Sequence, residues 1–204
     1  MQGSSAHPKA QLFRLLAGIF FRELTDREIA LYREAAAEPL LAAAGSGRAA
    51  QQAVADFRFA IANWEQHAGL KRALAADYAR LFLLPGRSAA PPYASAYLEE
   101  GGQLAGAAHD RMTVRLTGAG MALSDGSREP ADHLSVMLEY LAELYGQEAP
   151  VEPPEAFIAV ELLPWTGRFA AAASRVSPHD CFYAAAARLC AATLEGARPP
   201  VRPA

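Results

Sequence analysis

Residues that favour β-strands are scarce in this sequence. Valine, isoleucine and threonine together make up only 16 of its 204 residues, whereas alanine and leucine are abundant. Because alanine and leucine are good helix formers and β-branched side chains favour strands, this balance predicts an all-α protein. A chain of this length can bury an ample core in one large domain or in two small ones.

Cysteine is scarce as well, and the net charge is small. Cys181 and Cys190 are expected in one helix, about 13 Å apart along its axis and on opposite faces. A disulfide between them is therefore not expected, and such sparse use of cysteine is typical of a reducing compartment. A formal net charge of −3 gives no electrostatic reason to expect nucleic acid or an anionic membrane as a partner.

No apolar run approaches the roughly 20 residues needed to cross a bilayer. The short run 15–21 superficially resembles the core of a signal peptide, but Arg22 and Glu23 close it and the helical periodicity continues. We therefore expect no stable membrane insertion and a cytoplasmic location.

The patterns of common metal and catalytic sites are also missing. The histidines are scattered, at positions 7, 67, 109, 133 and 179, and neither His-x-x-x-His nor Cys-x-x-Cys occurs. A Gly-x-Ser-x-Gly elbow is absent, and Gly118-Ala119-Gly120 follows an expected helix, as a helix C-cap would. We therefore expect no metal, no cofactor and no catalytic residue.

Helical periodicity, by contrast, is present along most of the chain. Apolar residues at spacings of three and four predict a domain of about eight to ten helices over residues 1–196, followed by a disordered tail at 197–204. Residues 85–102 carry no helical pattern, and this loop or the connection 118–128 is where two subdomains would join. The expected helices cover 8–23, 25–39, 48–66, 70–83, 103–117, 129–145, 155–173 with an interruption at Pro164, and 177–195.

The most strongly patterned segment opens with Glu129-Pro130-Ala131-Asp132-His133. Proline fits the first turn of a helix and Asp132 suits the positive end of the helix dipole, so the motif is expected to begin a helix. His133 flanks the apolar stripe that follows, so an acid and an imidazole lie between core and water. Two interpretations stay open, a helix cap with a packed histidine or a binding site. The stripe consists of Leu134, Met137, Leu138, Leu141, Leu144 and Tyr145.

Two aromatic segments precede this motif. Tyr78, Leu81 and Phe82 occur at i, i+3 and i+4 and face one way on a helix, a spacing typical of core residues. The loop Pro91-Pro92-Tyr93-Ala94-Ser95-Ala96-Tyr97 has two tyrosines and no charge, which favours an ordered wall over disorder. Aromatic and apolar residues beside a few acids are typical of a groove for an amphipathic or extended peptide, with carboxylates that can pair with arginine.

Together these segments resemble the TorD/DmsD family, cytoplasmic maturation chaperones of molybdenum oxidoreductases that are related to the NarJ-type chaperones. Tyr78-x-x-Leu81-Phe82 matches the family's aromatic-x-x-Leu-Phe motif, and residues 91–98 are similar to the loop that follows it. Glu129-Pro130-Ala131-Asp132-His133 matches the signature Glu-x-Pro-x-Asp-His without its first spacer. Ala94 departs from the family, where many members have a polar residue, as do the tyrosines at 93 and 97, where some members have tryptophan. These departures leave open which oxidoreductase the protein would serve as a chaperone.

The resemblance implies an all-helical chaperone that is not an enzyme. Such a protein binds the twin-arginine signal peptide, and often the body, of a molybdoenzyme catalytic-subunit precursor until its molybdopterin cofactor is inserted, before Tat export. Some members are reported to bind guanine nucleotides weakly, and members occur as monomers or domain-swapped dimers. The sequence fixes neither the client, nor the oligomeric state, nor any direct binding of nucleotide or cofactor.

A twin-arginine signal joins two guanidiniums to an apolar run, so its receptor needs carboxylates beside an apolar slot. We expect Asp132, with Glu129, to receive arginine and His133 to fix the geometry of that corner. A plainer interpretation makes Leu81 and Phe82 core residues and Asp132 a helix cap. The other residues expected at the slot, from the three motifs, are Tyr78, Pro92, Tyr93, Ser95, Tyr97 and Pro130.

Two other functions compete with this one. A helical hydrolase would use Asp132 and His133 as an acid–base pair, but adjacent residues on a helix point about 100° apart and would need a third group. A permanent helical interaction subunit of an oxidoreductase complex would also present a large apolar surface.

Overall fold

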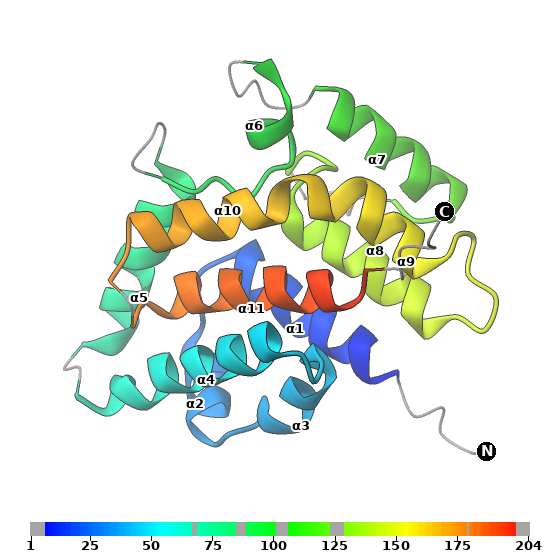
Figure 1. The fold of residues 1–204 in the computed structure, drawn as a ribbon. Coiled ribbons are helices and arrows are strands. Elements are labelled where there is room, and N and C mark those ends of the chain that lie inside the picture. Colours follow the sequence, from blue (N-terminus) through cyan, green and yellow to red (C-terminus); the bar gives the residue numbers. More distant parts are fainter. Residues whose placement is uncertain are drawn as a thin grey trace.

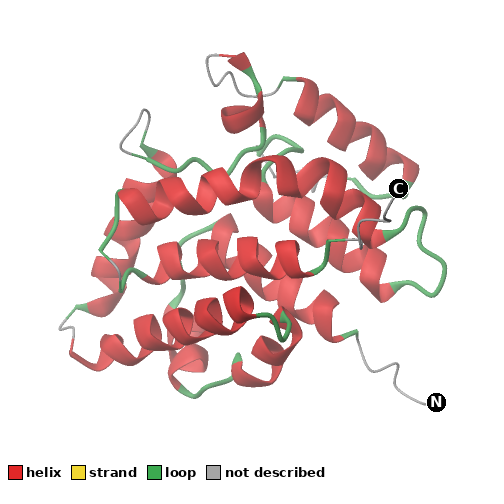
Figure 2. Ribbon diagram, viewed as in Figure 1, coloured by secondary structure: helices red, strands yellow, loops and turns green. Residues whose placement is uncertain are grey.

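The computed structural model describes residues 7–66, 69–84, 89–100, 106–122, 129–178 and 180–198. Within these ranges the regular elements are helices, and the extended pairing is limited to an isolated antiparallel bridge between Tyr93 and His133 (Figure 2). The all-α prediction is confirmed. Predictions for the tail beyond residue 198, for residues 85–88 and for residues 123–128 fall outside the described ranges.

The helices in chain order begin and end as follows: α1 Pro8–Phe21, α2 Asp26–Arg33, α3 Glu38–Leu41, α4 Arg48–Ala62, α5 Leu70–Tyr78, α6 Ser95–Leu98, α7 Ala107–Gly118, α8 Leu134–Gly146, α9 Pro154–Phe157, α10 Leu163–Arg175 and α11 Phe182–Gly196. In the described part of the chain, π-helical segments occur at Ala79–Leu83, directly after α5, and at Ile158–Leu162, between α9 and α10. Two short 3-10 segments follow α3 and α4, at Ala42–Ala44 and Asn63–Gln66.

The helix α11 lies in the middle of the fold. It packs between α10 and α4, and these three helices run side by side across the face shown in Figure 1. The alanines at 184–187 are all fully buried, and their small side chains let neighbouring helices approach α11 from several sides. Behind this layer, α1 packs mainly against α8 and also contacts α11. The helix α6 lies at one edge of the fold, where it contacts both α10 and α7 (Figure 1).

Local signals explain several helix boundaries. At the start of α2, Thr25 and Glu28 form the predicted capping box, in which Glu28 N–H donates to Thr25 Oγ1 at 3.3 Å and Thr25 N–H donates to Glu28 Oε2 at 2.7 Å. The chain turns after Arg33, through Ala35 in a left-handed conformation at φ 57°, so the helix predicted for 25–39 is two short helices. Pro164 also acts as predicted, because it lies in the first turn of α10 after the π-helical segment has interrupted the helix.

Further boundaries also differ from the prediction. The last helix begins at Phe182 and not at Ser177, because the Pro178 carbonyl accepts the Cys181 N–H at 3.1 Å in a turn that precedes the helix. Cys181, which was expected within this helix, is its N-cap residue, and Cys181 and Cys190 are both buried, free cysteines. The loop expected over 85–102 contains the short helix α6. No helix among the described residues has the length and apolarity required to span a membrane.

Candidate functional site

The second and third sequence motifs lie against each other, although they are far apart in the sequence. Leu134 N–H donates to the carbonyl of Pro92 at 2.7 Å, and Tyr93 and His133 form the antiparallel bridge. These main-chain contacts join two segments into one unit, which we call the site junction (residues 92–97 and 129–134).

The helix α8 begins at Leu134, later than the sequence predicts. His133 has an extended backbone and is the N-cap residue, and its Nδ1 accepts the Ser135 N–H at 3.2 Å. Pro130 is therefore not in the first turn, and Asp132 does not cap its own helix. Both expectations are wrong, because the bonds to the segment around Pro92 hold this stretch in a turn and a bridge instead of a helix.

Asp132 is fully buried, with 0% of its surface exposed. Its Oδ2 accepts the Ser95 N–H at 2.8 Å, and its main-chain carbonyl accepts the Ala94 N–H at 3.1 Å. Since Ser95 is the first residue of α6, the carboxylate satisfies a helix N-terminus that belongs to a distant segment. The expectation that this carboxylate lies at an open rim, ready for a guanidinium, is wrong.

His133 is nearly as deeply buried, with 3% of its surface exposed, and its ring meets the Tyr93 ring edge to face at a centroid distance of 4.8 Å. Burial lowers the pKa of His133 to about 4, although the charges of Glu129 and Asp132 act in the opposite direction. Ser135 Oγ lies 2.6 Å from Nδ1, the nitrogen that also accepts the Ser135 amide. A neutral imidazole that accepts at Nδ1 fits these contacts.

Glu129 is the carboxylate of the site junction that reaches the surface. Glu129 and Tyr93 are both partly exposed, and the Tyr93 hydroxyl donates to Glu129 Oε2 at 2.5 Å. Burial, together with this bond to a carboxylate, raises the pKa of Tyr93, so the phenol keeps its proton. A negative charge and an aromatic ring therefore lie together at the surface, held in one orientation by a hydrogen bond.

The first motif forms core. Tyr78, Leu81 and Phe82, which we call the α5 triad, are all buried. The Tyr78 hydroxyl donates to the Phe20 carbonyl at 3.0 Å, and the ring of Phe82 meets that of Phe20 edge to face. The structure thus favours the core interpretation of Leu81 and Phe82 over an open slot wall.

The α5 triad is nevertheless connected to the site junction. Within the π-helical segment the Leu81 carbonyl accepts the Ala90 N–H at 2.7 Å, which fixes the chain two residues before Pro92. Phe169 of α10 contacts both groups, with ring centroids 6.0 Å from Phe82 and 6.3 Å from Tyr97. The three motifs therefore meet around one layer of aromatic side chains, of which the α5 triad is the inner part.

The other residues of the site junction that the sequence suggested for the slot are Pro92, Ser95 and Tyr97. Tyr97 stacks on Trp165 with ring centroids 5.6 Å apart, and Pro92 and Ser95 are buried. Trp165 and Phe169 were missed as neighbours of the site, although their spacing of four residues on one helix is a signal that the sequence offers.

His109 was also missed, and the sequence gives no signal for it beyond one histidine in an expected helix. Its Nδ1 accepts the Ala131 N–H at 3.0 Å, so α7 contacts the Glu129–His133 motif directly.

The hydrolase alternative gains no support from these contacts. Asp132 accepts from Ser95 and His133 accepts from Ser135, so the two side chains do not form the acid–base pair that this function would need. Across the described ranges, no three His, Cys, Asp or Glu side chains gather where they could hold a metal ion.

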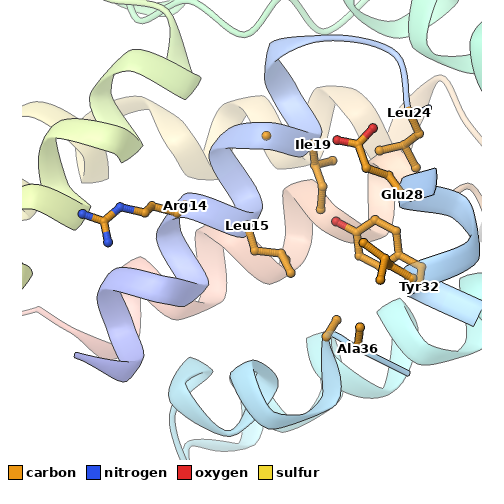
Figure 3. A pocket seen from close by; sticks show the side chains of 10 residues that line it. Arg14, Leu15, Ile19, Leu24, Glu28, Tyr32 and Ala36 are labelled. Atoms are coloured by element: carbon orange, nitrogen blue, oxygen red, sulfur yellow. The ribbon is translucent and has the colours of Figure 1, made fainter. Parts of the chain in front are cut away.

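A separate hollow of about 250 Å³ lies between α1 and α2 (Figure 3). Leu15, Ile19 and Tyr32 point toward one another across it, and Arg14 extends away from it. Glu28 lies at its edge, where burial alone would raise the pKa of the carboxyl but hydrogen bonds from Arg22 and Thr25 lower it to about 2. The ion pair with Arg22 satisfies this charge within the protein, and most of the other residues that line the hollow are apolar.

Comparison with known proteins identifies the family. Residues 34–171 match the profile of the family described as nitrate reductase delta subunit. Chaperone protein TorD of Vibrio cholerae is 30% identical over 199 residues, which covers 92% of this chain and 89% of that protein. Chaperone protein TorD of Shewanella loihica is 35% identical over 189 residues, covering 89% and 87% of the two chains.

A solved structure supports the fold. A protein from Archaeoglobus fulgidus, assigned to redox enzyme maturation, superposes with a TM-score of 0.52 at 23% identity. The match covers 92% of this chain and 94% of that one, so the helical architecture is shared along almost the whole length.

Proposed function

Because this chain belongs to the nitrate reductase delta subunit family together with the TorD chaperones, we propose that it is a cytoplasmic maturation chaperone for a molybdopterin-dependent oxidoreductase. It binds the twin-arginine signal peptide, the apo form of the enzyme, or both, until the cofactor is inserted. In doing so it keeps an immature precursor from Tat export. The chaperone itself needs no catalytic group and no cofactor of its own.

The observation that carries the signal-peptide part is the pair formed by Glu129 and Tyr93. Both carboxylates have an oxygen that takes no part in the bonds to Ser95 and Tyr93, but that of Asp132 is buried, whereas Glu129 is partly exposed. A guanidinium donates two parallel hydrogen bonds to a carboxylate and stacks on an aromatic face, so this pair suits arginine better than lysine. Of the two acids that the sequence suggested for arginine, Glu129 is therefore the one that we propose as its partner.

Exposed apolar side chains nearby in the chain support the binding of the apolar part of the signal. Leu83, 63% exposed, is the last residue of the π-helical segment that contains Leu81 and Phe82, and Leu84, 53% exposed, is its C-cap residue. The same segment fixes Ala90 through the Leu81 carbonyl, so these leucines belong to the stretch that leads into the site junction. Large exposed leucines are a feature of surfaces that bind apolar peptide segments.

Titration of the full-length protein with a synthetic peptide that carries Ser-Arg-Arg before an apolar run tests this function. Replacing Glu129 by Gln removes the charge but keeps the shape, and affinity should fall about tenfold, as expected for the loss of a charged hydrogen bond. Glu148→Gln, the same change at an exposed position beyond α8, is the matched control. A second peptide with Lys-Lys in place of Arg-Arg should bind the wild type more weakly.

Equal affinities for Glu129→Gln and Glu148→Gln would remove Glu129 from the proposal. If the wild-type protein ignores the peptide but co-purifies with a mature oxidoreductase, the alternative of a permanent interaction subunit replaces the chaperone. Weak binding of guanine nucleotide, and a monomeric or domain-swapped dimeric state, stay predictions from the family resemblance.

A further inference from the structure

The helix α7 supplies one direct hydrogen bond to the motif that carries Glu129. Ala131 N–H donates to His109 Nδ1 at 3.0 Å, and Ala131 is fully buried. Without the imidazole this amide would be a buried donor that has lost its partner, a costly state for a backbone group. Because Nδ1 accepts, the neutral ring carries its proton on Nε2.

Ala131 lies at the centre of the turn that presents Glu129. The turn is closed by a bond from His133 N–H to the Pro130 carbonyl at 3.0 Å. On one side of Ala131 the Glu129 carboxylate bonds Tyr93, and on the other side Asp132 holds the start of α6. The bond from α7 is therefore the contact that fixes the middle of the turn from outside the site junction.

The helix that carries His109 is itself firmly attached to the body of the protein. Arg111 and Arg115 both donate to Glu161, which is 1% exposed and lies in the second π-helical segment. Trp165 Nε1 donates to the main-chain carbonyl of Glu161 at 2.9 Å, which ties this segment to α10. A buried carboxylate between two guanidiniums holds its partners in fixed directions, so α7 presents the imidazole from a rigid support.

From these contacts we infer that His109 is a positioning residue of the client site, which holds the Glu129 turn in the orientation that receives arginine. Its role in binding rests on the proposed function, whereas its hold on the turn does not. The side chain need not touch the client, because it acts through the Ala131 amide and the peptide units that connect it to Glu129.

Three variants of the full-length protein separate positioning from general structure. His109→Leu removes the acceptor, whereas His109→Asn keeps an oxygen at the place of Nδ1, because both atoms are two bonds from Cβ. Asp110→Asn is the matched control, an exposed neighbour on the same helix. The readouts are affinity for the Ser-Arg-Arg peptide and the hydrogen exchange rate of the Ala131 amide.

We expect His109→Leu to weaken peptide binding about fivefold, the equivalent of one hydrogen bond, and to speed exchange at Ala131 by a similar factor. His109→Asn should restore most of both, and Asp110→Asn should change neither. The inference is overturned if His109→Asn weakens peptide binding as much as His109→Leu does. It is also overturned if the exchange rate of the Ala131 amide is unchanged in His109→Leu. If the Leu variant does not fold, His109→Gln replaces it, because its oxygen lies one bond further out.

The experiment distinguishes a failure of the proposed function from a failure of the positioning role of His109. If the wild type does not bind the peptide at all, the proposed function fails, and exchange at Ala131 alone decides whether His109 holds the turn. If the wild type binds and Glu129→Gln weakens binding but His109→Leu does not, the proposed function stands and the positioning role is overturned.

Discussion

The α5 triad and the site junction are both made of motif residues, but they differ in where their side chains find partners. Tyr78, Leu81 and Phe82 are enclosed among rings of other helices, and the polar atom of Tyr78 is satisfied by a main-chain carbonyl. At the site junction Tyr93 and Glu129 are partly exposed and satisfy each other. The inner region maintains the shape of the fold, and the outer region presents a charge and a ring to a partner.

The two carboxylates of the third motif repeat this difference within a few residues. Asp132 is enclosed, and its hydrogen bond to Ser95 joins α6 to the start of α8. Glu129 is held at the surface by one phenol. Within the described ranges the other oxygen of Asp132, Oδ1, has no hydrogen-bond partner, but it is buried, so a guanidinium could reach it only if the surrounding packing opened. The difference predicts that changes in the inner group reduce stability and changes in the outer group reduce binding.

The largest effect should come from the inner region. Phe82→Ala removes a buried ring that contacts Phe20, Tyr78 and Phe169, and the free energy of unfolding should fall by about 3 to 5 kcal/mol. Leu84→Ala, at a leucine that is 53% exposed, should change it by less than about 0.5 kcal/mol. Urea denaturation followed by circular dichroism measures both.

A contrary result would change the assignment of Phe82 to the inner region. If Phe82→Ala keeps full stability and instead loses peptide binding, the ring belongs to the client site. The same denaturation experiment applies to Leu81→Ser, which places a hydroxyl in the core and for that reason should not be used as a test of binding.

The sequence predicts the parts of the fold that depend on local patterns. Apolar periodicity predicted α1, α4 and the body of α8 well, because apolar residues on the buried side of a helix recur every three to four positions. The capping box at Thr25 was also predicted, because it depends only on two residues that are three positions apart in the sequence. The α5 triad was recognised as a helical set, and its spacing correctly allowed the core interpretation.

The sequence does not predict the features that depend on hydrogen bonds between distant segments. The start of α8 was placed too early because nothing in Glu129–His133 shows that Pro92, Ala94 and Ser95 will bond to it. The π-helical segments keep the apolar spacing of ordinary helices over a single turn, so periodicity does not reveal them. For the site, the motifs were identified, but which carboxylate is buried follows only from the packing of α6 and α7.

The second prediction concerns Asp132. Asp132→Ala leaves the buried Ser95 N–H without its acceptor, and the free energy of unfolding should fall by about 1 to 3 kcal/mol. Asp132→Asn keeps an oxygen for this bond, so the free energy of unfolding should fall by less. The Ser95 hydroxyl is a buried group with no partner within the described ranges, so Ser95→Ala should be nearly neutral. Thermal unfolding of the three variants gives the order, and equal losses for Ala and Asn at position 132 would show that the hydrogen bond to α6 contributes little.

The smallest predicted effect is a pH dependence carried by His133. Its pKa is about 4 in the folded protein, below the ordinary value near 6.5, so between these values the unfolded chain binds a proton that the folded chain does not. The free energy of unfolding should therefore fall as the pH is lowered through this window, by about 1 to 2 kcal/mol at pH 5 relative to pH 7.5. His133→Asn keeps an N-cap oxygen but has no titrating ring, so it is the matched control for every other group that titrates in the same range. Urea denaturation of both proteins at the two pH values isolates the contribution of the imidazole as a difference. If the two proteins lose the same stability, His133 is not held neutral by its burial, and the site junction is more open to water than its contacts with Tyr93 and Ser135 indicate.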